Sequence, residues 1–243
     1  MKILLLAGTG EARVLAKLLA GQGQDVLASL AGVTCTPLAY PVPTRVGGFG
    51  GEAAQRAFMI DQDFDAVVDA THPFAAQISE RSQRISKELT MPYTRLLRRE
   101  WRAEEGDNWQ LIDMPDEASS RIPPGARVLL ATGAVSVSEW AGLADSRTLF
   151  CRRVDETDQH FPFEGGWIVG RPPFSLEEEL DTLRNHRITH LVSKNAGGPT
   201  GAKLLAARQL GLPVVMLNRP ALPDCDRVET PEEALAWLTI LKA

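Results

Sequence analysis

Residues 1–16, MKILLLAGTGEARVLA, contain the pattern that decides the fold. The apolar run at residues 3–7 is typical of a buried strand, and the GTG turn at residues 8–10 leads directly into an amphipathic helical pattern. A glycine turn before a helix N-terminus lets a pyrophosphate approach free backbone N–H groups, and the helix dipole favours its charge. The stretch therefore predicts a nucleotide-binding α/β domain, although Arg13 stands where the common G-x-G-x-x-G pattern has its third glycine.

The rest of the chain alternates apolar runs with helical patterns, which indicates parallel sheets built from βαβ units. Strands are predicted at residues 3–7, 26–30, 66–70, 93–96, 110–112, 128–131, 148–152, 167–169, 190–193 and 214–217. Helices are predicted at residues 10–20, 52–62, 74–89, 136–141, 175–186, 200–210 and 231–241. The charged stretch 97–108 has no apolar period, and we interpret it as the crossing between a nucleotide-binding domain, residues 1–100, and a second α/β domain, residues 101–243.

The second predicted strand ends on a residue that bears on cofactor choice. A site for NAD usually has Asp or Glu about 20 residues after the glycine turn, where it binds the ribose 2′-hydroxyl. Ser29 and small apolar residues occupy that place, so a 2′-phosphate would meet no repelling carboxylate. Arg45, in a stretch with glycines at 47, 48, 50 and 51, is the nearest cation, although the same stretch is also typical of a flexible surface hairpin.

Four loops follow the carboxyl ends of predicted strands, which is where open α/β sheets bind their ligands. They cover residues 69–74, 132–134, 194–198 and 218–220, and each holds polar residues or glycines. His72 and Lys194 are the titratable side chains that we select from them as candidates. A histidine in such a loop is equally typical of a structural cap, and a lysine of a solvated loop edge.

Composition excludes several classes of protein. The chain of 243 residues has a net charge of −5, which argues against a nucleic-acid binder. Cys35, Cys151 and Cys225 are too widely spaced for a metal or redox motif, so a reducing cytoplasm fits. No apolar run approaches the length that spans a membrane, and residues 1–2 run straight into a strand without the pattern of a signal peptide.

Four fragments of the chain carry a resemblance to a known family. The fragments AGTGEARVLA, DATHPFA, LLATG and KNAGGPTGAKLLAARQLGLPVVMLNRP together resemble the precorrin-6A reductase family of cobalamin biosynthesis, from the first strand to about Pro220. The resemblance implies two Rossmann-like α/β domains with largely parallel sheets and a cleft between them. It also implies NADPH-dependent reduction of a double bond of the precorrin-6A macrocycle to give precorrin-6B, with neither a bound metal nor a flavin.

The expected site combines the turn and the strand-end loops. Precorrins carry acetate and propionate carboxylates, which arginine and lysine side chains bind well. His72 and Lys194 are the expected catalytic residues, as sources of the proton that completes the reduction, with water as the alternative source. The residues expected to bind NADPH are Gly8, Thr9, Gly10, Glu11, Ser29, Arg45, Gly48, Thr71 and His72. The residues expected to bind the macrocycle are Thr132, Gly133, Arg152, Arg171, Lys194, Asn195, Gly198, Lys203 and Arg219.

Alternatives remain open at this point. The sequence does not separate a metal-free substrate from the cobalt-containing one of the anaerobic branch, and a non-catalytic NADP-binding sensor would need only the first domain. A short-chain alcohol dehydrogenase is excluded, because neither Tyr40 nor Tyr93 is followed four residues later by lysine. The expected partner is a small polycarboxylate macrocycle, with no nucleic acid or membrane, and the oligomeric state stays open, with a monomer among the alternatives.

Overall fold

The computed structural model describes residues 1–32 and 38–242 and divides into two units. Unit 1 comprises Met1–Arg99 and Pro220–Ala243, and unit 2 comprises Glu100–Arg219. Cys35, one of the three cysteines considered above, lies outside the described residues. Each unit is a parallel sheet with helices, which confirms the predicted fold class.

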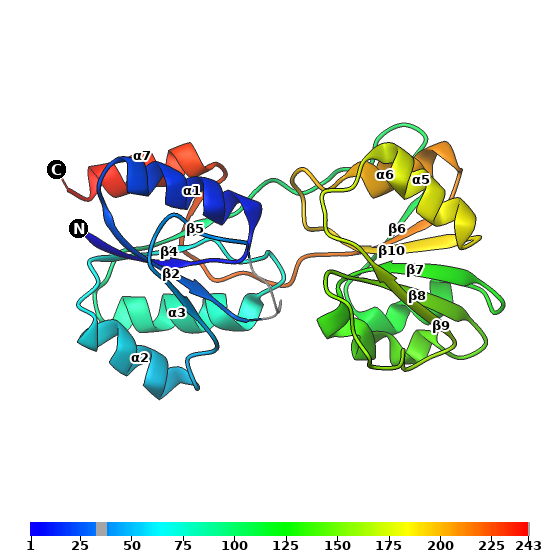
Figure 1. Cartoon of the computed structure of the whole chain (residues 1–243), viewed down its shortest axis with the longest axis horizontal. Coiled ribbons are helices and arrows are strands. Elements are labelled where there is room, and N and C mark those ends of the chain that lie inside the picture. Colours follow the sequence, from blue (N-terminus) through cyan, green and yellow to red (C-terminus); the bar gives the residue numbers. More distant parts are fainter. Residues whose placement is uncertain (33–37, 243) are drawn as a thin grey trace. The chain divides into compact units, whose positions relative to one another are not determined.

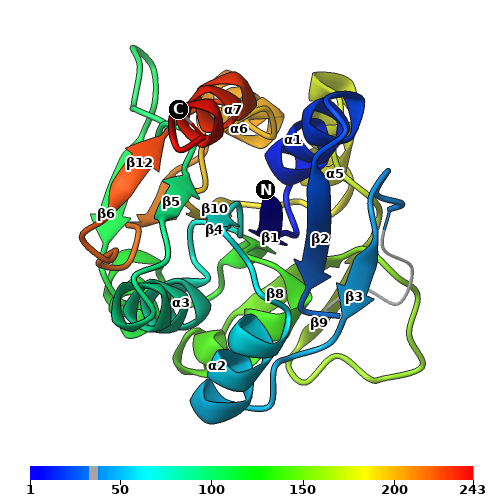
Figure 2. The ribbon, with the colours of Figure 1, turned by 90° about the vertical axis from the view of Figure 1, so that its left-hand side faces the viewer.

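Unit 1 has a six-stranded parallel sheet within its described residues, in the order β12-β5-β4-β1-β2-β3. Its strands are β1 (Lys2–Leu6), β2 (Asp25–Leu30), β3 (Thr44–Val46), β4 (Ala66–Asp69), β5 (Tyr93–Leu96) and β12 (Asp226–Val228). Its helices are α1 (Gly10–Gly21), α2 (Glu52–Asp61), α3 (Ala76–Glu88) and α7 (Pro231–Ile240). Helices α1 and α7 cover one face of the sheet, and α2 and α3 cover the other (Figures 1 and 2).

The apolar run of β1 forms the centre of unit 1, because its side chains alternate between two cores. Ile3 and Leu5 are fully buried in the core under α1 and α7, whereas Leu4 and Leu6 belong to the core under α2 and α3. Burial on both faces is what a near-continuous apolar strand of a parallel sheet requires. The carboxyl end of β1 is thereby fixed at the middle of the sheet, directly before the glycine turn.

Unit 2 has a second parallel sheet, with the order β6-β11-β10-β7-β8-β9 among its described residues. The strands are β6 (Trp109–Ile112), β7 (Arg127–Ala131), β8 (Thr148–Arg153), β9 (Gly165–Val169), β10 (His190–Lys194) and β11 (Val214–Leu217). The helices are η1 (Pro115–Glu117), α4 (Ala118–Arg121), η2 (Ala134–Leu143), α5 (Leu176–Asn185) and α6 (Ala202–Gln209). Helices α5 and α6 pack together on one face, over a core that includes Leu183, Leu204 and Met216 (Figure 1).

The C-terminal segment differs from the predicted division of the chain. Residues 101–243 were expected to form one domain, but the chain returns to unit 1 after Arg219. There β12 pairs in parallel with β5, and α7 packs on α1 with Leu238 buried in the unit 1 core. The predicted helix 231–241 was confirmed, but its burial partner lies more than two hundred residues earlier in the chain, which local pattern does not reveal.

Five further elements were not predicted in their observed form. Strands β3 and β12 are three-residue edge strands whose residues are exposed or half-buried, so they lack the apolar run that marks a strand. The predicted helix 136–141 is the longer 3₁₀ segment η2, in which the Ser136 hydroxyl bonds back to the carbonyls of Thr132 and Gly133. Such back-bonding competes with regular helical hydrogen bonds. The short turns η1 and α4 contain too few residues to show a period.

Candidate functional site

The glycine turn after β1 is held by the side chains of Thr9 and Tyr40, which bond to backbone groups of the turn, of α1 and of the residue after β4. Thr9 caps α1, since its hydroxyl accepts a hydrogen bond from the Ala12 N–H at 3.1 Å and donates to the Ala70 carbonyl at 2.8 Å. The Tyr40 hydroxyl accepts from the Gly8 N–H at 3.3 Å and donates to the Thr9 carbonyl at 3.4 Å. Thr9 is thus the N-cap of α1, and its two hydrogen bonds fix the glycine turn at the start of that helix.

A cavity of about 450 Å³ opens at the carboxyl ends of the strands of unit 1; we call it the unit 1 cavity. A volume of this size is within the range of small-molecule sites. Its lining includes five residues predicted to bind NADPH, namely Gly8, Ser29, Gly48, Thr71 and His72. The other lining residues are Leu6, Ala7, Leu30, Ala31, Gly32, Val46, Gly47, Phe49, Ala75, Ile78 and Arg81.

Gly8 combines an unusual backbone conformation with open space. Its φ is +132°, a conformation that L side chains rarely adopt, and a Cβ atom placed there would meet no other atom of the protein within 4 Å. The open side of the residue belongs to the unit 1 cavity. The absence of a side chain therefore leaves the backbone approachable, as a site for a pyrophosphate requires.

Arg45 and Ser29 are direct neighbours in the sheet of unit 1. Strand β3 pairs in parallel with β2, in a register that sets Arg45 opposite Ser29. The Arg45 guanidinium donates to the Ser29 hydroxyl at 2.7 Å and to the Gly48 carbonyl at 3.0 Å, and it stacks 4.1 Å from the Phe49 ring centre. Arg45 does not line the cavity itself, but all three of these partners do. Burial of the guanidinium lowers the Arg45 pKa from its ordinary value.

The loop after β4 is held by a buried carboxylate. One oxygen of Asp69 accepts the Thr71 N–H at 3.0 Å and the Thr71 hydroxyl at 2.6 Å. The other oxygen accepts the Tyr93 hydroxyl at 2.8 Å and lies 4.0 Å from Nε of Arg95, which is fully buried. Asp69 thereby positions the loop that presents His72 to the cavity.

One nitrogen of the His72 ring accepts a hydrogen bond from within the same loop. Its Nδ1 accepts the Phe74 N–H at 3.3 Å, and His72 lines the unit 1 cavity with its side chain exposed. In the neutral ring, the proton then resides on Nε2. The Nδ1 contact is the structural contact expected of a loop histidine.

Glu11 and Gly10, also predicted to bind NADPH, lie in the first turn of α1 outside the cavity lining. The Glu11 carboxylate forms an ion pair with Arg98 at 2.8 Å, where both side chains are mostly buried. This ion pair links the first turn of α1 to the segment that follows β5.

In unit 2, three of the predicted residues meet where β7 and β10 end side by side. The Lys194 ammonium donates to the Ser136 hydroxyl at 3.0 Å, and that hydroxyl bonds to the carbonyls of Thr132 and Gly133. Burial lowers the Lys194 pKa from its ordinary value, against smaller opposing effects of Glu139 and Cys151. A lysine with a lowered pKa can release its proton more readily than a solvated one.

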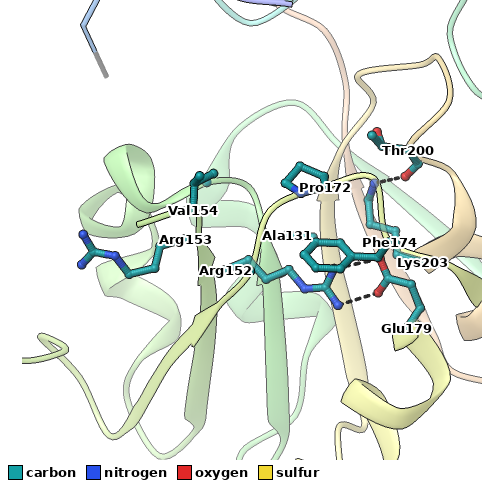
Figure 3. Close-up of a pocket in the computed structure, with 11 residues that line it drawn as sticks. Ala131, Arg152, Arg153, Val154, Pro172, Phe174, Glu179, Thr200 and Lys203 are labelled. Atoms are coloured by element: carbon teal, nitrogen blue, oxygen red, sulfur yellow. Dashed lines mark hydrogen bonds and ion pairs between the residues drawn. The ribbon is translucent and has the colours of Figure 1, made fainter. Parts of the chain in front are cut away.

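A cavity of about 200 Å³, the unit 2 cavity, lies beside this cluster and is drawn in Figure 3. Gly133, Arg152 and Lys203, all predicted to bind the substrate, line it together with Arg153 and Phe174. The Arg152 guanidinium forms two hydrogen bonds to the buried Glu179 carboxylate, at 2.8 and 2.7 Å, and lies 4.1 Å from the Phe174 ring centre. The charged residues of the lining are thus three cations, Arg152, Arg153 and Lys203, and one carboxylate, Glu179.

The remaining predicted residues of unit 2 lie outside the lining of that cavity. Asn195 exchanges hydrogen bonds with the backbone of Trp101, and the Gly198 carbonyl accepts from the Trp101 indole N–H at 3.0 Å. Arg219 donates to the Asn195 and Ala196 carbonyls at 2.9 and 3.0 Å. Arg171 pairs with Asp155 at 3.4 Å. Asn195 and Gly198 therefore lie in the loop that follows Lys194, and Arg219, which follows β11, holds that loop through its carbonyls.

Sequence reasoning missed Tyr40, Phe49 and Arg81 in unit 1. Tyr40 contacts the turn from 31 and 32 residues further along the chain, and no local pattern announces that contact. Arg81 lies on a helix whose buried face consists largely of serines, Ser79, Ser82 and Ser86, so its apolar period is weak. Phe49 lies at the centre of the glycine-rich stretch 47–51 and was not among the predicted site residues. The signal that could have identified it is an aromatic residue surrounded by glycines.

Neither metal ligands nor membrane spans emerge from the described part of the chain. No cluster of three or more His, Cys, Asp or Glu side chains is placed to hold a metal ion there. Among the described helices, none combines the length and apolar character needed to cross a bilayer.

Comparison with known proteins gives one consistent family. The family model described as precorrin-6x reductase CbiJ/CobK matches residues 2–239. The chain is 39% identical to precorrin-6A reductase of Rhodobacter capsulatus, over 98% of this chain and 95% of that protein. It is 38% identical to precorrin-6A reductase of Rhodococcus erythropolis, over 99% and 98% of the two chains.

A solved structure titled CobK precorrin-6A reductase agrees with these matches. It superposes with a TM-score of 0.93 at 37% identity and covers 100% of this chain and 98% of its own. The resemblance inferred from the four fragments is thus confirmed by full-length sequence and by fold. The chain belongs to the precorrin-6x reductase CbiJ/CobK family of cobalamin biosynthesis, whose members are oxidoreductases that act on a tetrapyrrole-derived macrocycle.

Proposed function

We propose that the chain reduces a double bond of precorrin-6A with NADPH as the reductant and yields precorrin-6B. Membership of a reductase family implies a nicotinamide cofactor in general. The observation that carries the choice of NADPH is the pairing of Arg45 with Ser29 at the end of β2. In this reaction NADPH supplies the hydride, and the protein positions the reactants and provides a proton.

The residues of unit 1 fit such a cofactor. Gly8 leaves its backbone open to a pyrophosphate, and no Asp or Glu lines the unit 1 cavity. A 2′-phosphate beside Ser29 would meet the Arg45 guanidinium, whose planar donors suit phosphate oxygens. A carboxylate in the place of Ser29 would instead favour the free 2′-hydroxyl of NAD.

The residues of unit 2 fit a polycarboxylate. Arg153 and Lys203 line the unit 2 cavity, and the Glu179 carboxylate in its wall is paired with Arg152. The excess positive charge favours acetate and propionate groups of the macrocycle. Lys194, near Thr132 and Gly133, is our candidate proton source in this unit, and His72 is the candidate in unit 1.

The substrate form and the location of the reaction are also part of the proposal. We propose the metal-free macrocycle, because both curated relatives reported above are named precorrin-6A reductase without reference to cobalt. The cobalt-containing macrocycle is the second candidate substrate, and parallel assays with both forms would identify the preferred one. We place the reaction in the cytoplasm, since the cysteine spacing fits a reducing compartment.

The proposed reaction is tested by incubating the protein with precorrin-6A and NADPH. We expect loss of NADPH absorbance together with a product that is heavier by one hydride and one proton in mass spectrometry. Binding of NADP without any turnover of either macrocycle would favour the sensor alternative instead.

Replacing Arg45 with methionine tests the cofactor preference. We expect kcat/KM for NADPH to fall by about 10- to 100-fold, since a hydrogen-bonded charge contact contributes about 1.5–3 kcal/mol, while kcat/KM for NADH stays near its wild-type value. Steady-state kinetics with both nucleotides measures the ratio. Arg56→Met is the matched control, because Arg56 lies on α2 in ion pairs with Glu52 and Glu88 and does not line the cavity. An unchanged NADPH:NADH ratio in Arg45→Met would remove Arg45 from the site.

A further inference from the structure

We propose that Arg81, oriented by the buried Gln55, binds the adenine base of the nucleotide in the unit 1 cavity. The inference rests on the proposed function, since it assigns one part of the same cofactor. It adds a specificity residue and a positioning residue that lie on α3 and α2, away from the glycine turn.

Arg81 belongs to a single face of α3 that forms one wall of the cavity. Ile78 and Arg81 of α3 are spaced by three residues and line the cavity together with Ala75, the N-cap of the helix. Side chains at this spacing lie one above the other on a helix. Arg81 is therefore a half-buried cation at the end of an otherwise apolar wall.

The orientation of Arg81 is set by Gln55. The Arg81 Nε–H donates to the Gln55 side-chain oxygen at 2.6 Å, and the Gln55 amide nitrogen donates to the Ser82 hydroxyl at 2.7 Å. Gln55 and Ser82 are fully buried. Because arginine has only donors, the Gln55 oxygen must face Arg81, and the amide has one favourable orientation. This chain of hydrogen bonds engages Nε, and the two terminal nitrogens of the guanidinium form no hydrogen bond to the described residues.

Arg81 forms no ion pair within the part of unit 1 that the structure describes, although its charge contributes, after Arg84 and Arg56, to the lowered pKa of Glu52. Arg84, one turn further along α3, forms an ion pair with Glu52, and Arg56 of α2 forms ion pairs with Glu52 and Glu88. No carboxylate among the described residues lies within ion-pair distance of Arg81, and none lines the cavity. The helix pair thus holds Arg56 and Arg84 in direct ion pairs with acids, whereas Arg81 lines the cavity without such a direct pair.

The chemistry of the walls favours a heteroaromatic base over a phosphate as that ligand. Leu30, Val46, Phe49 and Ile78 are apolar lining residues, and Gly47 and Gly48 present backbone without side chains. A flat, largely apolar ring fits this environment, and a planar guanidinium can stack on the ring or donate to its nitrogen acceptors. The phosphates have other places in the proposed function: the pyrophosphate at the Gly8 turn and the 2′-phosphate at Arg45.

Two fragments of the cofactor separate base binding from phosphate binding. We expect Arg81→Met to weaken competitive inhibition by 5′-AMP and by 2′,5′-ADP by the same factor, about 10-fold, the size of a partly desolvated cation–π contact. Arg45→Met should weaken inhibition by 2′,5′-ADP alone, because 5′-AMP has no 2′-phosphate. Arg84→Met, an exposed arginine of the same helix, is the control and should leave both inhibition constants unchanged.

Gln55→Met tests the positioning role. We expect it to weaken inhibition by 5′-AMP by a smaller factor than Arg81→Met, and the double variant to bind no worse than Arg81→Met alone, as coupled residues do. Thermal melts accompany each variant, since a loss of stability without a change in the 5′-AMP constant would assign Gln55 a structural role only and overturn its positioning role.

The inference on Arg81 is overturned if Arg81→Met leaves both inhibition constants unchanged, or if it weakens 2′,5′-ADP and spares 5′-AMP. The second result would assign Arg81 to the 2′-phosphate. A wild-type protein that binds no NADP in calorimetry would overturn the proposed function itself. That outcome is distinct from normal wild-type binding with an unaffected Arg81→Met variant, which would overturn the Arg81 inference alone.

Discussion

Replacing Gly8 with valine is expected to abolish NADP binding while unit 1 remains folded. The new side chain would enter the open side of the turn, which belongs to the unit 1 cavity and not to the packed core. Overpacking a fixed site costs about 1–3 kcal/mol, and each hydrogen bond to a charged group that is lost adds about 1.5–3 kcal/mol, so affinity should fall by at least about 100-fold. Calorimetric titration with NADP measures the affinity, and circular dichroism measures the fold.

The positive φ of Gly8 requires a control for backbone strain. Gly23 has a φ of +64° after the end of α1, and a side chain there would likewise meet no other atom within 4 Å. Gly23→Val therefore carries a left-handed backbone penalty of about 1–3 kcal/mol without touching the turn. It should lower the melting temperature and keep NADP binding. If Gly8→Val is folded and binds NADP as tightly as wild type, the cofactor cannot occupy the turn.

The first turn was predictable from sequence because its signals are local. The apolar run of β1, the glycines and the Thr9 cap all lie within ten residues, and each acts on its immediate neighbours. The same is true of the α7 capping box, in which Thr230 and Glu233 bond to one another's backbone N–H groups. Local chemistry of this kind is visible in any single sequence.

The pairing of Arg45 with Ser29 was only partly predictable. The sequence showed that an acid is missing at Ser29 and that Arg45 is the nearest cation. It did not show that residues 44–46 form an edge strand, because Thr44 and Val46 are exposed and the strand has three residues. The register of β3 on β2 sets Arg45 opposite Ser29 and allows their hydrogen bond. This register depends on pairing between strands, which a local sequence pattern does not show.

Pairing between distant segments explains why the predicted domain division was wrong for residues 220–243. Val228 pairs with Leu96 in the sheet of unit 1, across more than one hundred residues that include all of unit 2. Neither β12 nor the segment that precedes it has an apolar pattern from which its pairing with β5 could be predicted. A helix such as α7 shows its amphipathic face in the sequence, but not which sheet that face covers.

Replacing Lys194 with methionine is expected to lower kcat for precorrin-6A by about 100-fold or more, the usual effect of losing a general acid. The KM for NADPH should remain unchanged, because Lys194 lies in unit 2 and is proposed to act on the macrocycle. Single-turnover and steady-state kinetics measure the two parameters. Lys87→Met, at an exposed lysine of α3, is the matched control and should behave as wild type.

The pH dependence distinguishes a proton donor from a simple cation at residue 194. Because burial lowers the Lys194 pKa, the ammonium loses its proton at a lower pH than a solvated lysine, and wild-type kcat should fall as pH rises through that lowered pKa. Lys194→Arg keeps the charge at all these pH values but cannot release a proton. If Lys194 is the donor, the arginine variant is as slow as Lys194→Met at every pH. If it recovers wild-type kcat and retains it at high pH, Lys194 binds a carboxylate of the macrocycle, and the proton comes from another group.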